Sequence, residues 1–257
     1  MSFPEAVTIK EVVTEADGVK TLRFSLKRKC LPGQFLMIWI PGIDEIPMSL
    51  SYIDNLKGIT VREVGEATRA LCSLRPGDLL GVRGPYGRGF SLSKGRVLCV
   101  GGGNGIAPLM PAAEALRRDS VDFAIGAKTE TELVFVERAK KCSNYVAIST
   151  DDGTKGLRGT VVELAAKMLN KEKYDMMLAC GPEPMLSQLF DLCKKHDIDC
   201  QFSLERFMKC GIGICGSCAI DGKRVCKEGP VFSRRELESL IEFGKFRRDA
   251  SGMRITF

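Results

Sequence analysis

The stretch Cys210–Cys218 reads Cys-Gly-Ile-Gly-Ile-Cys-Gly-Ser-Cys and determines what kind of domain ends this chain. Together with Cys226 it forms the pattern C-x4-C-x2-C-x7-C. A C-x4-C-x2-C run completed by a more distant cysteine is the plant-type ligand spacing for a [2Fe–2S] cluster. Glycines among the cysteines let the loop turn tightly and point backbone N–H groups at the sulfurs. We therefore predict a [2Fe–2S] cluster held by Cys210, Cys215, Cys218 and Cys226.

Other interpretations of the cysteines are a structural zinc site, which more often presents two C-x2-C pairs, and an accidental group of thiols. The chain has eleven cysteines, and the seven outside the motif occur singly, several of them in apolar stretches. Buried free cysteine behaves as a small hydrophobe, and the reducing cytosol keeps such thiols free. We expect no disulfide framework.

Composition is that of a globular protein of 257 residues, enough for one large or two ordinary domains. The net charge is +6, but the basic residues are scattered and lack the interleaved aromatics of a single-strand binder, so we expect no nucleic acid partner. No apolar run approaches the ~18 residues of a membrane span. The N-terminus lacks a signal-peptide pattern, so we expect a cytoplasmic protein without membrane contact.

Residues 1–94 carry the pattern of a small antiparallel β-barrel. Short runs rich in Val, Ile, Leu and Thr alternate with turn signals such as Asp17-Gly18. The expected strands are Ala6–Val13, Val19–Leu26, Gln34–Ile40, Leu50–Ile53, Ile59–Val64 and Leu79–Val82, with one helix over Ala67–Ser73.

Residues 95–204 alternate strand and helix patterns, which predicts a doubly wound parallel sheet. The expected strands are Val97–Val100, Val121–Ile125, Val146–Ser149, Met176–Ala179 and Cys200–Leu204, and the expected helices are Ala107–Arg118, Glu130–Lys141, Gly159–Leu169 and Pro184–Lys195. Residues 205–257 should form a small iron–sulfur domain that ends with a helix. Ser233 and Glu236 predict a capping box at the start of that helix, and Leu237, Leu240 and Ile241 predict its apolar face. The fold class is a multidomain α+β and α/β protein.

Two loops of the α/β segment predict a nucleotide site, because each follows an expected strand and opens a helix. Glycine lets the backbone approach a pyrophosphate, and a helix N-terminus favours an anion. Both loops lie at the sheet edge where ligands of open α/β sheets bind. The G-x-G-x-x-G fingerprint fails at Ile106, so a merely tight turn remains an alternative. The candidate cofactor-binding residues are Gly102, Gly103, Asn104 and Gly105 in the first loop and Cys180, Gly181 and Pro182 in the second.

Asp151 and Asp152 follow a third strand at the same edge. Paired carboxylates would repel a 2′-phosphate, which favours NAD over NADP. The pair could instead shape a turn before Gly153.

The order of barrel, nucleotide segment and cysteine motif resembles the ferredoxin–NADP reductase superfamily. Within it, the chain looks like the electron-transfer subunits of class B dihydroorotate dehydrogenases. The resemblance spans almost the whole chain. It is most specific at residues 203–218, followed by residues 225–232, Val-Cys-Lys-Glu-Gly-Pro-Val-Phe. The stretches Gly84-Pro85-Tyr86-Gly87 and Cys180-Gly181-Pro182 also look like those of the superfamily.

The resemblance implies a route for electrons. A partner subunit oxidises dihydroorotate on its own FMN, and the cluster relays single electrons to an FAD, which passes hydride to NAD. The resemblance also implies a 2+2 heterotetramer with that FMN-containing catalytic subunit and a place in pyrimidine biosynthesis. We identify no catalytic acid or base in this chain, because the cofactors perform the chemistry.

The resemblance further implies a flavin site on the barrel. The family's Arg-x-(aromatic or aliphatic)-Ser/Thr element corresponds to residues 46–49, where Ile46 replaces the arginine that neutralises the FAD pyrophosphate. Arg62 or Arg69 is a candidate replacement for that charge, and a flavin site without it leaves FMN as an alternative to FAD. The residues implied to bind flavin are Pro47, Met48, Ser49, Thr60, Val61, Arg62, Ala67 and Thr68. Ser49 and Thr68 have a second interpretation as ordinary barrel and helix-cap residues.

Two other functions remain open on the residues alone. One is the small subunit of a ferredoxin–NADP or sulfide-linked reductase, which shares these domains. The other is a non-catalytic redox or nucleotide sensor, which the missing arginine favours through loss of flavin.

Overall fold

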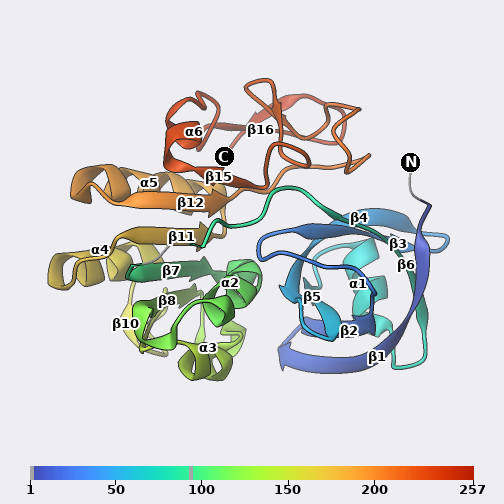
Figure 1. Ribbon diagram of the computed structural model, residues 1–257, viewed down its shortest axis with the longest axis horizontal. Coiled ribbons are helices and arrows are strands. Elements are labelled where there is room, and N and C mark those ends of the chain that lie inside the picture. Colours follow the sequence, from blue (N-terminus) through green and yellow to red (C-terminus); the bar gives the residue numbers. More distant parts are fainter. Residues whose placement is uncertain (1–2, 93–94) are drawn as a thin grey trace.

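The computed structural model describes residues 3–92 and 95–257. Figure 1 shows the N-terminal barrel beside a layer of parallel strands, with the C-terminal segment along one edge of that layer. The predicted boundary between residues 94 and 95 adjoins residues 93–94, which lie outside the described ranges. In the described part of the chain, no helix combines the length and apolar character that crossing a membrane requires.

Six antiparallel strands close into a barrel in the order β1-β2-β5-β4-β3-β6. Their bounds are β1 Glu5–Ala16, β2 Val19–Ser25, β3 Phe35–Ile40, β4 Asp44–Tyr52, β5 Leu56–Arg62 and β6 Leu79–Tyr86. Helix α1 covers Glu66–Ser73, as expected. Alternating side chains such as Ile38 and Ile59 are fully buried in the barrel core. The barrel is confirmed, although β4 begins at Asp44, because its first half pairs with β3.

A second sheet has seven strands in the order β10-β9-β8-β7-β11-β12-β15. All of them pair in parallel except β15, which is antiparallel to β12. Their bounds are β7 Val97–Gly102, β8 Val121–Ala127, β9 Tyr145–Thr150, β10 Leu157–Arg158, β11 Met176–Cys180, β12 Asp199–Ser203 and β15 Val231–Ser233. The five expected strands are confirmed, and β10 and β15 extend the sheet at its two ends.

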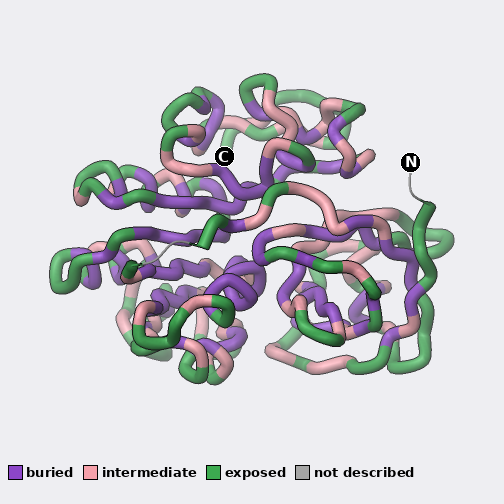
Figure 2. Tube along the Cα trace, in the orientation of Figure 1, coloured by how far each residue is buried: buried purple, intermediate pink, exposed green. Residues whose placement is uncertain are grey.

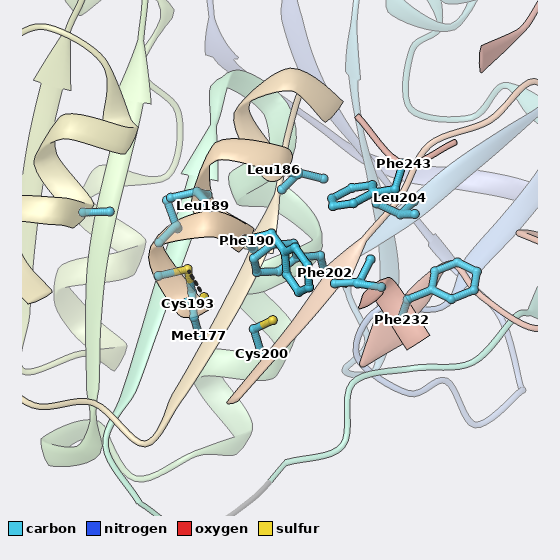
Figure 3. Close-up of a cluster of buried hydrophobic side chains, with 14 of the residues drawn as sticks. Met177, Leu186, Leu189, Phe190, Cys193, Cys200, Phe202, Leu204, Phe232 and Phe243 are labelled. Atoms are coloured by element: carbon cyan, nitrogen blue, oxygen red, sulfur yellow. Dashed lines mark hydrogen bonds between the residues drawn. The ribbon is translucent and has the colours of Figure 1, made fainter. Parts of the chain in front are cut away.

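Helices cover both faces of this sheet, so its strands are buried (Figure 2). On one face α2 (Met110–Ala115) and α3 (Val136–Cys142) pack in one apolar cluster. On the other face α4 (Val161–Lys171) and α5 (Glu183–His196) pack in a second cluster. Figure 3 shows Phe190 of α5 beside Phe202 of β12 in that cluster, with ring centroids 6.3 Å apart. The doubly wound prediction is confirmed.

Two expected helices differ from the prediction. The helix expected over Ala107–Arg118 starts as a 3₁₀ helix at Gly103–Leu109 and continues as α2 only to Ala115. Pro108 and Pro111 lack the N–H that a continuous α-helix would use there. The helix expected over Glu130–Lys141 is a 3₁₀ turn, Glu130–Glu132, followed by α3, because Phe135 takes the left-handed conformation.

The C-terminal segment is attached to the sheet through β15. It also contains two short hairpins and a helix, whose bounds are β13 Ala219–Ile220, β14 Lys223–Arg224, α6 Arg234–Glu238, β16 Phe246–Arg248 and β17 Arg254–Thr256. The capping box of Ser233 and Glu236 is present at the start of α6. Leu237 and Leu240 are buried, but Ile241 is 74% exposed. The prediction for Ile241 is wrong, because α6 ends before that residue.

Candidate functional site

A cleft of about 350 Å³ lies where the barrel, the nucleotide segment and the cysteine segment meet. Its walls come from all three parts of the chain. The lining residues are Phe35, Pro47, Met48, Ser49, Thr60, Arg62 and Thr68 from the barrel, Asn104, Ala107, Pro108 and Leu204 from the nucleotide segment, and Glu205, Arg206, Met208 and Pro230 from the cysteine segment.

Six of the eight residues predicted to bind flavin line this cleft. Val61 and Ala67 do not, because Val61 is fully buried in the barrel core and Ala67 packs against it. Thr68 has two roles. Its Oγ1 accepts hydrogen bonds from the backbone N–H groups of Val64 and Gly65, each at 2.9 Å, so it caps α1 as well as lining the cleft.

Arg62 is the cationic candidate that the structure places in the cleft, whereas Arg69 is not among the lining residues. Nη1 of Arg62 lies 3.3 Å from Oε2 of Glu132, and Nη2 of Arg62 is buried without a hydrogen-bond partner in the described residues. Oδ1 of Asn104, in the same cleft, is also buried without a partner. Ile46 packs against the barrel core instead. Because buried polar groups need partners, the cleft fits a ligand with phosphate oxygens and polar hydrogens, as FAD has.

The two nucleotide loops touch each other at the ends of neighbouring strands, β7 and β11. Strand order reverses between these strands, which makes this edge the topological switch point of the sheet. A Cβ on Gly105 would lie 2.1 Å from the carbonyl oxygen of Cys180. Gly102 and Gly181 are each closely covered by Met185. These three glycines therefore allow protein to pack on protein, and only Gly103 faces open space, at φ +54°.

The helix that follows the first loop does not start where the sequence predicted. Gly103–Leu109 is a 3₁₀ helix, and α2 begins only at Met110, so no α-helix N-terminus lies at the glycines. Asn104 is the predicted residue of this loop that reaches the cleft, and Cys180, Gly181 and Pro182 do not line it.

Asp152 shapes a turn, which was the alternative for the acidic pair. Its Oδ1 accepts hydrogen bonds from the backbone N–H and the hydroxyl of Thr154, at 3.0 and 2.7 Å. These bonds lower the pKa of Asp152. Asp151 is exposed at the same edge and remains free to face a nucleotide ribose.

The four predicted cluster ligands form two pairs of neighbouring thiols. Cys210 and Cys215 lie within hydrogen-bonding reach of each other, and so do Cys218 and Cys226. Among the described residues, no three Cys, His, Asp or Glu side chains converge as ligands of one metal ion. Two thiolates for each of two irons is the arrangement of a [2Fe–2S] cluster, so the two pairs fit that group.

Backbone N–H groups point at these sulfurs, as the glycine spacing predicted. The N–H of Gly213 donates to Sγ of Cys226 at 3.1 Å, and that of Ile214 donates to Sγ of Cys210 at 3.4 Å. Gly213 can do so because its backbone takes the left-handed conformation, at φ +81°. Burial raises the pKa of the Cys210 thiol, but the backbone N–H groups of residues 212, 214 and 215 outweigh burial and lower it to about 6. Cys210 is therefore a thiolate at neutral pH.

Several cleft residues were missed by the sequence analysis. Glu205 follows β12 at the ligand-binding edge of the sheet, which is the signal that could have found it. It is open to water through the cleft but closely surrounded by protein, and this desolvation raises its pKa. Arg206 forms a buried ion pair with Glu183, whose side chain is 5% exposed. Glu183 also accepts the N–H of Gly244 at 2.8 Å, so this pair joins the second nucleotide loop to the cysteine segment.

Comparison with known proteins identifies the family. A protein of Methanothermobacter thermautotrophicus, named "Probable dihydroorotate dehydrogenase B (NAD(+)), electron transfer subunit", is 45% identical over 264 residues and covers 99% of this chain and 98% of its own. The chain belongs to this family. A relative of the same name from Thermoplasma volcanium is 47% identical over 247 residues, with 96% of each chain covered. The family model for the iron–sulfur cluster binding domain of dihydroorotate dehydrogenase B matches residues 205–238.

The fold of this electron-transfer-subunit family recurs in solved structures. A chain from the structure of an NADH-dependent reduced ferredoxin–NADP oxidoreductase is 28% identical, with a TM-score of 0.80, and 93% of this chain and 92% of that chain are covered. The reductase of an Amycolatopsis cytochrome P450 shares the fold at 22% identity, with a TM-score of 0.63 over 75% of this chain. The fold class predicted from the sequence is confirmed.

Proposed function

We propose that this chain is the NAD-linked electron-transfer subunit of a dihydroorotate dehydrogenase, an oxidoreductase subunit that serves pyrimidine biosynthesis. The observation that carries the proposal is the single cleft at which flavin-type barrel strands, the nucleotide segment and the cysteine segment meet. Membership of the family named for this activity supports it.

The two thiol pairs support Cys210, Cys215, Cys218 and Cys226 as the cluster ligands. Cys210 and Cys215 would hold one iron, and Cys218 and Cys226 the other. The N–H groups of Gly213 and Ile214, which already donate to these sulfurs, would stabilise the negative charge of the cluster.

The flavin site follows from the cleft lining. Pro47, Met48, Ser49, Thr60 and Thr68 supply its walls. Arg62 would pair with the FAD pyrophosphate through its free Nη2. Arg62 and Pro47 line the same cleft, and Pro47 directly follows Ile46, the position where the family arginine is missing.

NAD would bind at the switch point formed by the first loop, with Gly102, Gly103, Asn104 and Gly105, and the second, with Cys180, Gly181 and Pro182. When bound, the cluster carries single electrons, the flavin joins them in pairs, and NAD accepts a hydride. The chain's own contribution is to hold these groups around one cleft. Because Met208 lines the cleft two residues before Cys210, the cluster loop and the flavin cleft share one short stretch of backbone.

The name of the relatives, electron transfer subunit, implies a partner catalytic subunit. We propose that this partner carries FMN, that the assembly is a 2+2 heterotetramer and that it is cytoplasmic. The three functional parts of the chain would be residues 1–94 for flavin, 95–204 for NAD and 205–257 for the cluster.

Copurification with a catalytic subunit tests this function. The chain, coexpressed with the dihydroorotate-oxidising flavoprotein of its own genome, should form a stable complex that reduces NAD with dihydroorotate. A chain that oxidises NADH with a dye acceptor, yet neither binds that flavoprotein nor supports the coupled reaction, would instead be the small subunit of another reductase. If the chain, reconstituted with flavin, does not oxidise NADH with a dye acceptor, the sensor becomes the favoured function.

A further inference from the structure

A chain of hydrogen-bonded side chains runs from the cleft through the barrel to a carboxyl group. Thr60 of β5 lines the cleft, and its Oγ1 lies 2.9 Å from Oγ1 of Thr21 on β2. Oγ1 of Thr21 lies 2.6 Å from Oε1 of Glu15 on β1. On the other side, Oγ1 of Thr60 lies 2.8 Å from Oγ of Ser51. Thr21 and Ser51 are fully buried and Thr60 is 6% exposed, so no bulk water competes for these bonds.

The direction of these bonds depends on one proton. A hydroxyl has a single hydrogen, so Thr21 and Thr60 can each donate only once. If Glu15 is ionised, Thr21 donates to it and Thr60 donates to Thr21, so the Thr60 hydrogen is not available to Ser51, the acceptor on its other side. If Glu15 is protonated, every bond points away from it. The two states differ by the passage of one proton along the chain.

Glu15 is placed to exchange that proton with water. Glu15 is half-buried, on the side of the barrel that faces the nucleotide segment. Burial raises the pKa of Glu15, and Glu11 acts in the same direction, whereas the Thr21 hydroxyl and Arg138 of α3 act against it. Tyr52 of β4 also faces this carboxyl, and Arg23 of β2 and Glu114 of α2 lie near that ring. The carboxyl therefore takes up a proton nearer to neutral pH than an exposed glutamate does.

The proposed function, on which this inference rests, requires such a proton. Electrons leave an iron–sulfur cluster without protons, whereas a hydride carries one proton with two electrons. The balance is two electrons, one H⁺ and one NAD⁺ giving one NADH, so one proton must enter the cleft for each NAD⁺ reduced.

We propose that Glu15, Thr21 and Thr60 form a proton path between solvent and the flavin cleft. In the direction of NAD reduction, Glu15 gives its proton to Oγ1 of Thr21, and Thr21 gives its own to Oγ1 of Thr60. Thr60, which lines the cleft, turns its hydroxyl away from Ser51 and releases one proton there. Glu15 then takes a proton from water, and the chain returns to its first state.

Thr21→Val tests the path, because valine keeps the shape of threonine and removes the hydroxyl, and Thr21→Ser restores it. The flavin-loaded protein is reduced by dithionite, which delivers electrons without protons, or by NADH, which delivers a hydride. We expect Thr21→Val to slow dithionite-driven flavin reduction roughly a hundredfold, the scale of a lost proton-transfer group, and to leave NADH-driven reduction unchanged. Thr21→Ser should restore the rate and its solvent deuterium isotope effect.

A second variant, Glu15→Gln, provides a readout that does not depend on turnover. The infrared difference spectrum between oxidised and reduced protein should contain a carboxyl C=O band that is missing in Glu15→Gln. Flavin-loaded Thr21→Val with wild-type dithionite rate and isotope effect would overturn the proton path alone. A wild-type protein that binds neither flavin nor cluster would overturn the proposed function, and the proton path with it.

Discussion

Two glycine-rich loops of this molecule use glycine for different purposes. In residues 210–216 the glycines stand at positive φ, and the N–H of Gly213 donates to a cysteine sulfur. In residues 101–105 most glycines stand where a Cβ would collide with the protein itself, as at Gly105 against the Cys180 carbonyl oxygen. The cysteine loop points backbone N–H groups at its sulfurs, whereas the first nucleotide loop packs against the second. Glycine in a strand–helix loop is therefore not by itself a sign that a phosphate approaches the backbone.

The largest expected effect comes from removing a cluster ligand. Cys226→Ser should abolish cluster absorption and slow electron transfer from the partner to NAD. The loss should exceed about 10–100-fold, which is the cost of removing a residue that only supports a metal ligand. Visible spectra and coupled NAD reduction measure this. Cys142→Ser is the matched control, because Cys142 is half-buried outside the motif and should leave both unchanged. A Cys226→Ser protein with full cluster absorption would show that this loop is not built around iron.

Gly105→Ala tests the packing role of the first nucleotide loop, residues 101–105. The added methyl would lie 2.1 Å from a backbone oxygen, which cannot rotate away. We expect a loss of about 2–3 kcal/mol in the free energy of unfolding, measured with urea. Gly103→Ala is the control, since it meets no atom within 4 Å and is opposed only by its φ of +54°, a strain of about 1 kcal/mol. Equal losses in both variants would contradict the packing role of Gly105.

The sequence predicted the parts that depend on local patterns. Short runs rich in Val, Ile, Leu and Thr, separated by turn residues, predicted the barrel strands, and the cysteine spacing with its glycines predicted both the ligands and the N–H donors around them. Contacts between distant segments were not predictable in this way. Examples are the approach of Gly105 to Cys180, the pairing of β15 with β12 and the ion pair of Arg206 with Glu183. Ile241 was misplaced because the pattern does not show that α6 ends three residues earlier.

Arg62→Gln tests whether a side chain of the barrel, rather than a glycine-rich loop, binds the phosphates of FAD. Losing one charged hydrogen bond of about 1.5–3 kcal/mol should weaken FAD binding at least about tenfold. Fluorescence titration of the flavin-free protein measures the dissociation constant. Arg69→Gln, from a residue outside the cleft lining, should bind FAD as the wild type does. Unchanged affinity in Arg62→Gln would remove Arg62 from the flavin site.

The smallest effect concerns the support of the cluster loop. Arg224 pairs with Glu228 at 2.5 Å and donates to the Gly213 carbonyl at 3.0 Å. Arg224 lowers the pKa of Glu228 to about 2, so the pair stabilises the fold above the unfolded pKa of about 4.3 and loses this effect as the pH falls toward 2. Glu228→Gln should lower stability less than Gly105→Ala does at pH 7, because the pair is partly exposed. Urea unfolding should show the difference shrinking between pH 5 and pH 3, and a constant difference would contradict the assignment.

Composition and redox behaviour of the freshly purified, air-protected complex test the central claim most directly, namely that this cleft joins a [2Fe–2S] cluster to a flavin. We predict about two iron atoms, two acid-labile sulfides and one FAD for each copy of this chain. Anaerobic addition of NADH should bleach the flavin and the cluster together. One zinc per chain, with no iron and no flavin, would contradict the account.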